Sequence, residues 1–218
     1  MKKRYILFLL LSSLFLRVFA SPTDSISTVY RDGEFVTYCR VLVNTSDSNS
    51  VKVLDDFASQ MCYNLDGLFS WGLKGMNLRK EKQELMMFYF KSTSFNKKTN
   101  ILISVGDVII PGVITVPDVS ITTLLTTKKY TSGKSTANMD FISSNGFVKK
   151  MNTTFSTIPK KEKGVWFILE TRAQFGWFFN IFITQNRYKS TLEWRLKQYV
   201  HNLKNEAERR EKNRVISK

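Results

Sequence analysis

The residues of this chain that could do chemistry are few, and their spacing matches no catalytic motif. His201 is the single histidine among 218 residues. On a predicted C-terminal helix it lies about 200 degrees around from Tyr199 on the apolar stripe, which predicts a solvent-facing imidazole. Ser-His-Asp and Cys-His mechanisms need an imidazole held beside the nucleophile. The run 132–136 (SGKST) is similar to the end of a phosphate-binding loop, but Lys128 stands where the pattern requires a glycine. We therefore expect a polar loop there and no catalytic histidine.

A carboxylate is the remaining route to acid–base catalysis. Glu170 lies inside the apolar run 165–169, where burial would raise its pKa and suit it to proton transfer. Arg172 follows two residues later, on the same face of a strand, so an ordinary ion pair is the simpler interpretation. A catalytic role would need a second acid beside Glu170 in a cleft. The sequence thus favours a protein that is not an enzyme, and a carboxylate-dependent hydrolase or isomerase is the weaker alternative.

The cysteines and the histidine are too few for a metal site. Cys39 and Cys62 are the only cysteines, and with one histidine they do not make the usual four-ligand zinc set. No cofactor motif and no metal site are therefore predicted. Both cysteines fall on predicted core-facing positions, where they form either a disulfide in an oxidising compartment or two buried thiols.

The first twenty residues have the pattern of an export signal. Three basic residues at 2–4 precede an apolar run at 6–16, and residues 18–20 (VFA) end in the small-residue pattern that signal peptidase cleaves. We expect residues 1–20 to be removed and the protein to act in a periplasm or outside the cell; the short, lysine-led form is typical of bacteria. Removal takes away four basic residues and no acidic one, so the net charge falls from +15 to +11.

The chain after the signal divides into a short leader, one domain and a tail. Residues 21–33 are either a polar leader or an edge strand, 34–211 form a single globular domain, and 212–218 are a basic flexible tail. Asp32-Gly33 between two β-rich runs predicts a hairpin. In the second run, alternation puts Phe35, Cys39, Val41 and Val43 on the core-facing side.

Helical and β patterns follow one another along the domain. Apolar residues at three- and four-residue spacing over 54–69 predict an amphipathic helix, in two pieces joined near Asp66-Gly67. Ser190 and Glu193 form a capping box that opens a long C-terminal helix ending near Glu211, and residues 204–218 read as a solvated extension. Between them, β-branched and aromatic runs predict strands near 84–95, 100–110, 113–127, 137–142, 146–156, 164–173 and 177–184.

This order of elements defines an α+β plan and resembles a known superfamily. A curved antiparallel sheet of about six to seven strands, short helices after the first strand and a long closing helix are expected. Together with the run 175–184 (FGWFFNIFIT), Arg187-Tyr188 and 193–195 (EWR), they resemble the helix-grip domain of the START and SRPBCC (Bet v 1-like) superfamily over residues 34–211. The resemblance implies a cavity between sheet and C-terminal helix that takes up lipids, sterols or other apolar molecules.

The predicted final hairpin, 164–173 with 177–184, is apolar on both faces. Each face is covered by another layer, or one side lines a ligand cavity, or one side is an exposed interface. We expect ligand contacts from two-sided apolar strands and from the closing helix. The candidate contacts are Trp166, Trp177, Phe179 and Tyr199.

The excess of positive charge is spread over the chain. Lysine pairs recur near predicted turns, whereas nucleic-acid modules concentrate basic residues on one face, so no nucleic acid partner is expected. Attraction to an anionic membrane surface fits better. The leading hypothesis is an exported, non-catalytic protein that binds a hydrophobic or amphipathic small molecule, possibly a lipid. The alternative is an envelope interaction or structural protein with a filled core, no sizeable cavity and a conspicuous surface patch.

Overall fold

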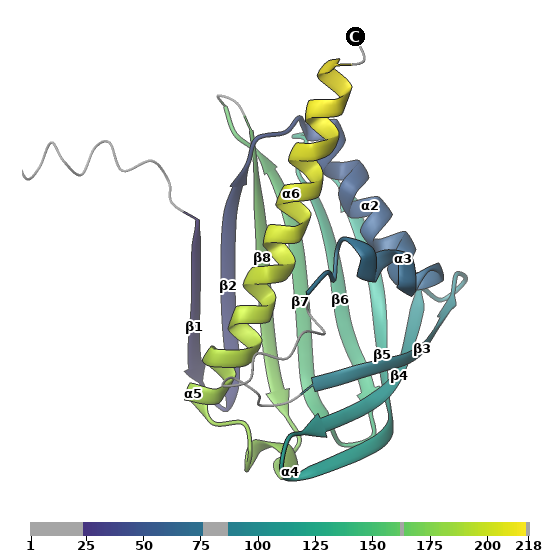
Figure 1. Cartoon of the computed structure of the whole chain (residues 1–218), viewed down its shortest axis with the longest axis vertical. Helices are drawn as coiled ribbons and strands as arrows, with labels where there is room; N and C mark the ends of the chain where they lie inside the picture. The colour runs from purple at the N-terminus through teal and green to yellow at the C-terminus, as the bar shows by residue number, and fades with distance from the viewer. Residues whose placement is uncertain (1–23, 76–86, 162–163, 217–218) are drawn as a thin grey trace, which may run out of the picture.

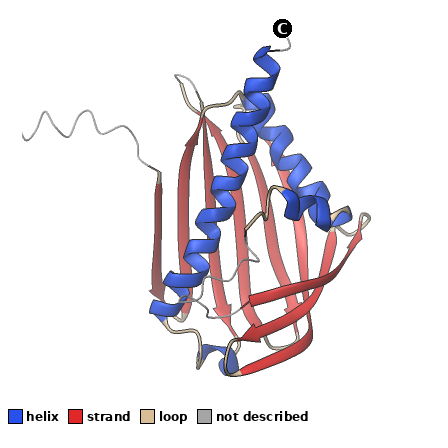
Figure 2. Ribbon diagram, in the orientation of Figure 1, coloured by secondary structure: helices blue, strands red, loops and turns tan. Residues whose placement is uncertain are grey.

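The computed structural model describes residues 24–75, 87–161 and 164–216, so the predicted signal at 1–20 lies outside the described residues. The strands form one antiparallel sheet, and the helices lie on one side of it (Figures 1 and 2). We call the side that faces the helices the inner face. The strands are β1 Ser25–Arg31, β2 Glu34–Val43, β3 Met87–Asn96, β4 Ile101–Ile110, β5 Ile114–Lys129, β6 Ser135–Ser144, β7 Val148–Pro159 and β8 Val165–Phe175. The helices are α2 Asp47–Tyr63, α3 Leu65–Ser70, α4 Trp177–Asn180, α5 Gln185–Tyr188, the π-helical segment η1 Lys189–Glu193, and α6 Trp194–Ile216.

The sheet order confirms the predicted α+β class. The eight strands run β1-β2-β8-β7-β6-β5-β4-β3, all neighbours antiparallel. The order brings β2, from the start of the domain, beside β8, from its end. Helix α6 lies across the inner face of this pair (Figure 1). The strand count is one above the predicted range.

The hairpin predicted at Asp32-Gly33 is confirmed. Both residues have positive φ, 53° and 80°, as a two-residue hairpin turn of the primed type requires. The turn pairs β1 with β2 from Ser25↔Arg40 to Arg31↔Glu34. Residues 25–31 are therefore an edge strand of the sheet.

The predicted core face of β2 is also confirmed. Phe35, Cys39, Val41 and Val43 are each at most 2% exposed. Three of them, with residues of β8, α2 and α6, form the core cluster under the helices. Thr37 lies on the same face and is buried, and its Oγ1 donates to the hydroxyl of Tyr188 at 3.3 Å.

The first helical region consists of two pieces, as predicted. The break lies at Asn64, two residues before the predicted joint, and this residue leaves helical geometry with φ −149°. Its Oδ1 accepts a hydrogen bond from the backbone N–H of Gly67 at 2.9 Å. An asparagine at this position caps the second piece because its side-chain oxygen replaces a missing helical acceptor.

The strand predicted at 177–184 is wrong. The chain leaves β8 at Gly176, whose N–H donates to the carbonyl of Phe147 at 3.0 Å, and the four-residue helix α4 follows. A run that is apolar on both sides does not distinguish a strand from a short helix by its period. Here Phe179 and Ile183, four residues apart, are each 4% exposed and enter a second core cluster.

The C-terminal helix begins earlier and ends later than predicted. Thr184 is the N-cap, and its Oγ1 accepts from the N–H of Arg187 at 3.4 Å. The predicted capping box is wrong, because Ser190 and Glu193 lie inside the π-helical segment and Ser190 Oγ donates to the carbonyl of Arg187. Helical structure then continues to Ile216.

The second core cluster fills the end of the sheet next to α4. Phe35 stacks on Tyr188 with ring centroids 4.0 Å apart and an interplanar angle of 4°. The ring centroid of Phe147 lies 5.8 Å from that of Phe175 and 4.9 Å from that of Phe179. These rings tie β2, the β6–β7 turn, β8 and α5 together.

The close approach at Gly176 predicts a steric effect of substitution. A Cβ at this residue would lie 1.9 Å from the carbonyl oxygen of Gly146, so the β6–β7 turn would have to move. We expect Gly176→Ala to lower the free energy of unfolding by about 2–3 kcal/mol, as overpacking does. Gly112→Ala is the control, because a Cβ there meets no atom within 4 Å and only the positive φ is strained; we expect about 1 kcal/mol. Urea denaturation measures both, and equal losses would contradict this account.

Candidate functional site

A small, partly open cavity of about 50 Å³ lies between α2, the inner face of β5–β7 and α6. Alternation along the strands and three- to four-residue spacing along α2 direct side chains into it. The lining residues are Leu54, Phe57, Ala58, Met61, Leu125, Thr126, Thr127, Ala137, Asn138, Met139, Thr153, Phe155 and Tyr199.

Tyr199 is the polar side chain that α6 contributes to the cavity. Its ring centroid lies 5.0 Å from that of Phe57 on α2 and 6.0 Å from that of Phe155 on β7. Burial raises the pKa of its phenol, because desolvation disfavours the charged form. Tyr199 is therefore neutral, and its hydroxyl is available for hydrogen bonding to a molecule in the cavity.

The composition of the wall defines the chemistry that the cavity admits. No described residue that lines it carries a charge, and the polar side chains that face it are hydroxyls, those of Thr127 and Thr153 on the inner face of the sheet and that of Tyr199. A volume of 50 Å³ holds about four water molecules at 10–15 Å³ each, far below the roughly 300 Å³ of a small-ligand pocket. Met61 and Met139 border it, and methionine side chains rearrange easily. The cavity thus suits a neutral, mostly apolar group and must widen to take a whole molecule.

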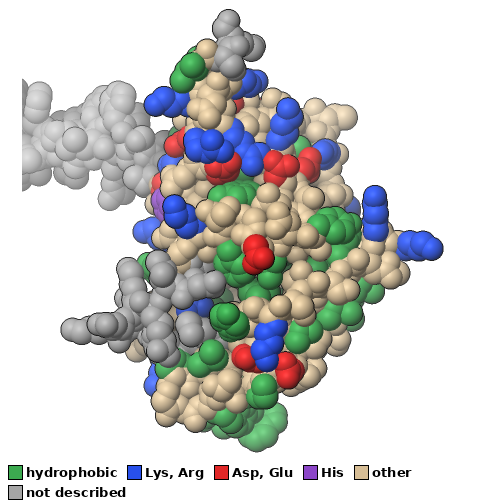
Figure 3. Space-filling view, turned by 45° about the vertical axis from the view of Figure 1, so that its right-hand side comes forward, with side chains coloured by type: hydrophobic (Ala, Val, Ile, Leu, Met, Phe, Trp, Pro, Cys, Tyr) green, Lys and Arg blue, Asp and Glu red, His purple; other side chains and the backbone are tan. Residues whose placement is uncertain are grey.

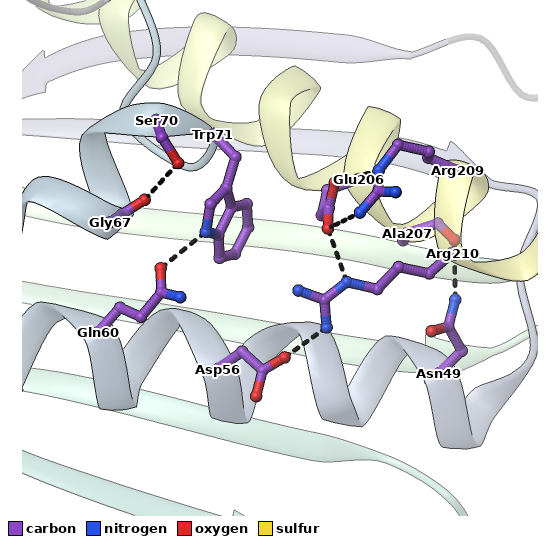
Figure 4. Close-up of polar contacts among 10 residues, drawn as sticks. All are labelled: Asn49, Asp56, Gln60, Gly67, Ser70, Trp71, Glu206, Ala207, Arg209 and Arg210. Carbon is purple, nitrogen blue, oxygen red and sulfur yellow. Dashed lines mark hydrogen bonds and ion pairs between the residues drawn. The ribbon is translucent and has the colours of Figure 1, made fainter. Parts of the chain in front are cut away.

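Helix α2 is held over this cavity by polar contacts with α6 (Figure 4). Asn49 Nδ2 donates to the carbonyl of Ala207 at 2.7 Å. The guanidinium of Arg210 donates to Asp56 on α2 and to Glu206 on its own helix. These contacts, together with the hydrogen bond between Trp71 and Gln60, determine how readily α2 can move away from α6.

Trp71 and Gln60 extend the same network towards α3. Trp71 Nε1 donates to Gln60 Oε1 at 2.7 Å, as Figure 4 shows. The guanidinium of Arg210 lies 5.6 Å from the centre of the indole ring. Asn202 of α6 donates to the carbonyls of Gly72 and Lys74, the turn that follows α3. Helices α2, α3 and α6 therefore form one hydrogen-bonded unit.

The end of α6, predicted as a solvated extension, is instead tied to the β2–α2 loop. Glu211 accepts hydrogen bonds from the N–H and the Oγ of Ser46 at 3.0 and 2.7 Å. Burial works against ionisation of this carboxyl, but the bonds from Ser46 and the nearby Arg214 guanidinium outweigh it and lower its pKa to about 2. Asn44 N–H also donates to Glu208.

The four ligand contacts predicted from the sequence are not brought together. Tyr199 alone lines the cavity. Trp166 lies on the outer face of the sheet, between the inward-facing Val165 and Phe167, and the Arg40 guanidinium covers its ring at 3.6 Å.

The other two predicted contacts belong to α4. Trp177 is 80% exposed and Phe179 is 4% exposed within the second core cluster. The prediction placed both in the cavity because it made residues 177–184 a strand beside 164–173. Residues 177–180 instead form a helix at the end of the sheet, so Trp177 and Phe179 lie away from Tyr199.

The two cysteines are free, buried thiols in the structure. Burial raises the pKa of each to about 11; at Cys39 the carboxylate of Asp24 adds to the effect. Cys39 belongs to the core cluster under α6, and Cys62 lies near the end of α2.

The remaining candidates for chemistry lie outside the cavity. Glu170 and Arg172 form the predicted ion pair, at 3.3 Å, and both side chains are well exposed. His201 is partly buried, and burial lowers its pKa. Among the described residues, no group of three His, Cys, Asp or Glu side chains could hold a metal ion.

Most residues of the cavity wall were not predicted from the sequence to contact a ligand. Ala58, Met61, Met139 and Thr153 line it, yet none belongs to a motif. The helical period already placed Leu54, Phe57, Ala58 and Met61 on one face of α2. What the period did not show is that β5, β6 and β7 lie opposite that face.

Comparison with known proteins identifies the fold. A scan against protein-family models and a search of curated proteins both gave no match. The di-domain aromatase/cyclase StfQ from the steffimycin biosynthetic pathway is similar in structure, with 12% identity and a TM-score of 0.50; the match covers 83% of this chain and 53% of StfQ. A START superfamily protein from Mycobacterium smegmatis matches with 12% identity and a TM-score of 0.48 over 80% of this chain and 97% of that one. A STAR-related lipid transfer protein from Xanthomonas axonopodis matches with 14% identity and a TM-score of 0.42, over 81% and 98%.

The strand order, the closing helix and the similarity to StfQ define the class: the chain has the helix-grip fold that the order of its elements predicted. An identity of 12% shows a similar fold and no more. The fold does not determine the function, because proteins with one fold can have many functions.

The contact between Glu211 and Ser46 predicts how stability changes with pH. A carboxyl whose pKa falls from 4.5 to about 2 on folding stabilises the fold above pH 4.5, and this contribution is lost as the pH falls towards 2. We expect Glu211→Gln to lower the free energy of unfolding by about 1–2 kcal/mol at neutral pH and the two proteins to converge below the folded pKa. Chemical denaturation across this pH range measures the difference.

The control is Glu170→Gln, which removes an exposed ion pair on the outer face. Such pairs contribute about 0–1 kcal/mol. A constant difference between wild type and Glu211→Gln down to pH 2 would show that the carboxylate is not what Ser46 binds.

Proposed function

We propose that the protein is an exported, non-catalytic binding protein that holds a neutral, mostly apolar small molecule, such as a lipid, between α2, α6 and the inner face of the sheet. The observation that carries the proposal is the partly open cavity at this place, whose described lining residues include no charged side chain. Mostly apolar walls with a few polar groups are typical of sites for such ligands.

Binding a whole molecule requires the cavity to widen. The side chains of Met61 and Met139 can change rotamer, and α2 can move outward if its contacts with α6 loosen. The bond from Asn49 to the Ala207 carbonyl and the ion pair of Arg210 with Asp56 oppose that motion. In this proposal the protein exchanges between the form described here and a wider form that the ligand favours.

The same wall supports a binding role rather than a catalytic one. Tyr199 is the ionisable group among the described lining residues, and burial raises its pKa, so it is a poor proton acceptor near neutral pH. Proteins with similar folds include, by name, both a lipid transfer protein and aromatase/cyclases. The fold therefore allows either role, and the side chains decide between them.

The proposal of export rests on the first twenty residues, which have the charge and apolarity pattern of a cleaved signal. Expression of the complete chain and mass spectrometry of the purified protein give its N-terminus. A mature chain that begins at Ser21 is the expected result, and an intact N-terminus would argue against cleavage.

An interaction protein of the cell envelope is the second candidate. It is favoured by the small size of the cavity, 50 Å³, and by large apolar side chains exposed on α4. A protein that neither carries nor takes up an apolar molecule would favour this candidate.

Filling the cavity tests the proposed ligand site. Ala58→Leu adds three carbon atoms to the wall on α2, which occupies the space that a ligand would enter. We expect native mass spectrometry, after incubation with a mixture of fatty acids and phospholipids, to show ligand on the wild type and at least tenfold less on this variant.

The matched control is Ser59→Leu, which places the same side chain one residue later at an exposed position of α2. It should load like the wild type. Without ligand, Ala58→Leu should unfold with an unchanged or higher free energy, because a filled cavity stabilises a core. Equal loading of both variants would place the ligand elsewhere, and an unloaded wild type would remove the proposal.

A further inference from the structure

Four large apolar side chains are exposed where α4 meets the β4–β5 turn. Val113 and Ile114 are 54% and 41% exposed, and Trp177 and Ile181 are 80% and 63% exposed. We call these four residues the apolar tip. Ile114 and Trp177 line one open surface groove together with residues of the β6–β7 turn. Figure 3 shows hydrophobic side chains at the surface of the lower end of the molecule, the end at which Figure 1 places α4.

The exposure of the tip is built into the fold. Phe179 and Ile183 point into the core and are each 4% exposed, and Phe179 packs edge-on against Phe147 at 4.9 Å. Trp177 lies two residues before Phe179, and Ile181 lies two residues after it, so both are directed away from the core side of this segment and are exposed. Phe178 and Phe182 are partly buried against the same cluster. Gly176 fixes the start of α4 against the β6–β7 turn through its bond to the Phe147 carbonyl. Trp177 and Ile181 cannot turn inward without removing the residues that anchor α4.

Basic side chains border the tip. Within the segments 108–117, 144–151 and 176–192 the charged residues are Lys149, Lys150, Arg187 and Lys189. The acidic residues that flank these segments are Asp107, Asp118 and Glu193, and Lys91 pairs with Asp107 and Asp118. Lys149 lines the same groove as Trp177. Arg187 Nη1 donates to the carbonyl of Phe182 at 3.2 Å, which places it next to Ile181. Lys150 reaches Glu34 at 3.4 Å.

We propose that the apolar tip docks on the surface of a lipid bilayer with anionic headgroups, with Trp177 and Ile181 entering the interface and Lys149 and Arg187 facing the phosphates. Tryptophan favours the membrane–water interface, where its ring is partly apolar and its N–H stays hydrated. Apolar side chains bordered by basic ones are the combination that binds anionic bilayers. In the part of the chain that the structure describes, no helix is long and apolar enough to cross a membrane. This inference goes beyond ligand binding and does not depend on it.

Flotation with vesicles tests the tip. The protein obtained by expressing the complete chain is mixed with vesicles of phosphatidylcholine, with or without phosphatidylglycerol. Trp177→Ser/Ile181→Ser should lower partitioning on the mixed vesicles by roughly tenfold or more, from the apolar area it removes. Lys149→Gln/Arg187→Gln should lower it about fivefold per charge on the mixed vesicles and leave binding to pure phosphatidylcholine unchanged.

The matched control is Tyr130→Ser/Ile216→Ser. Both residues are exposed, at 47% and 75%, and they lie at the end of the molecule opposite α4, in the β5–β6 turn and at the end of α6 (Figure 1). This variant should float like the wild type, because its apolar tip is unchanged. All variants share the same N-terminus, so any contribution of the N-terminus to flotation is equal among them. Circular dichroism melts of each variant confirm that it is folded.

Several outcomes would overturn the proposal. One is a wild type that does not float with anionic vesicles; another is an equal loss in the tip and control variants. A third is a wild type that fails to float but forms a cross-link to another protein that Trp177→Ser/Ile181→Ser abolishes, because the tip would then be a protein interface. Loading in the native mass spectrometry experiment is measured separately, so failure of the docking surface and failure of the ligand site remain distinguishable.

Discussion

The apolar inner face of the β2–β8 pair must be covered, and α6 covers it. Val200, Leu203 and Ala207 of α6 are completely buried in the cluster that contains Val41 and Phe167. Burying a valine or leucine side chain contributes about 1.5–3 kcal/mol. Antiparallel pairing of β2 with β8 creates this face, and α6, which follows β8 in the chain, lies across it. Without this cover the sheet would expose its core.

Helix α2 covers the neighbouring part of the sheet, and the site lies beneath it. The cavity of about 50 Å³ is bordered by Ala58 and Met61 of α2 and by Tyr199 of α6. Polar contacts such as Asn49 to the Ala207 carbonyl hold α2 to α6. Such bonds exchange with water at a net cost of about 1 kcal/mol each. Val53, Leu54 and Phe57 of α2 are also buried in the core cluster, so the apolar face of α2 contributes more to holding it on the sheet than its polar contacts do.

Local signals in the sequence predicted the local structure and much of the fold. Asp32-Gly33 predicted the hairpin because few residue pairs adopt positive φ at both positions of a turn. The alternation of side chains along β2 predicted which of its faces is in the core, because the other face is closer to water. The same reasoning failed at 177–184, where both sides are apolar and no period distinguishes strand from helix. Of the predicted ligand contacts, Tyr199 alone reached the cavity. The rest of its wall comes from α2 and three distant strands, and a sequence period does not specify which elements face one another.

The aromatic run from Phe175 to Ile183 serves two environments at once, which explains its composition. Phe175, Phe179 and Ile183 fill the end of the sheet, and this anchoring forces Trp177 and Ile181 into solvent. A chain selected only for a closed core would place polar residues at those two positions, because exposed tryptophan and isoleucine add nothing to packing. The charged residues within 176–192 are Arg187 and Lys189, and none is acidic. An apolar pair presented by a rigid anchor within a basic surrounding matches the interface of an anionic bilayer, where burial of the pair and attraction of the charges act in the same direction.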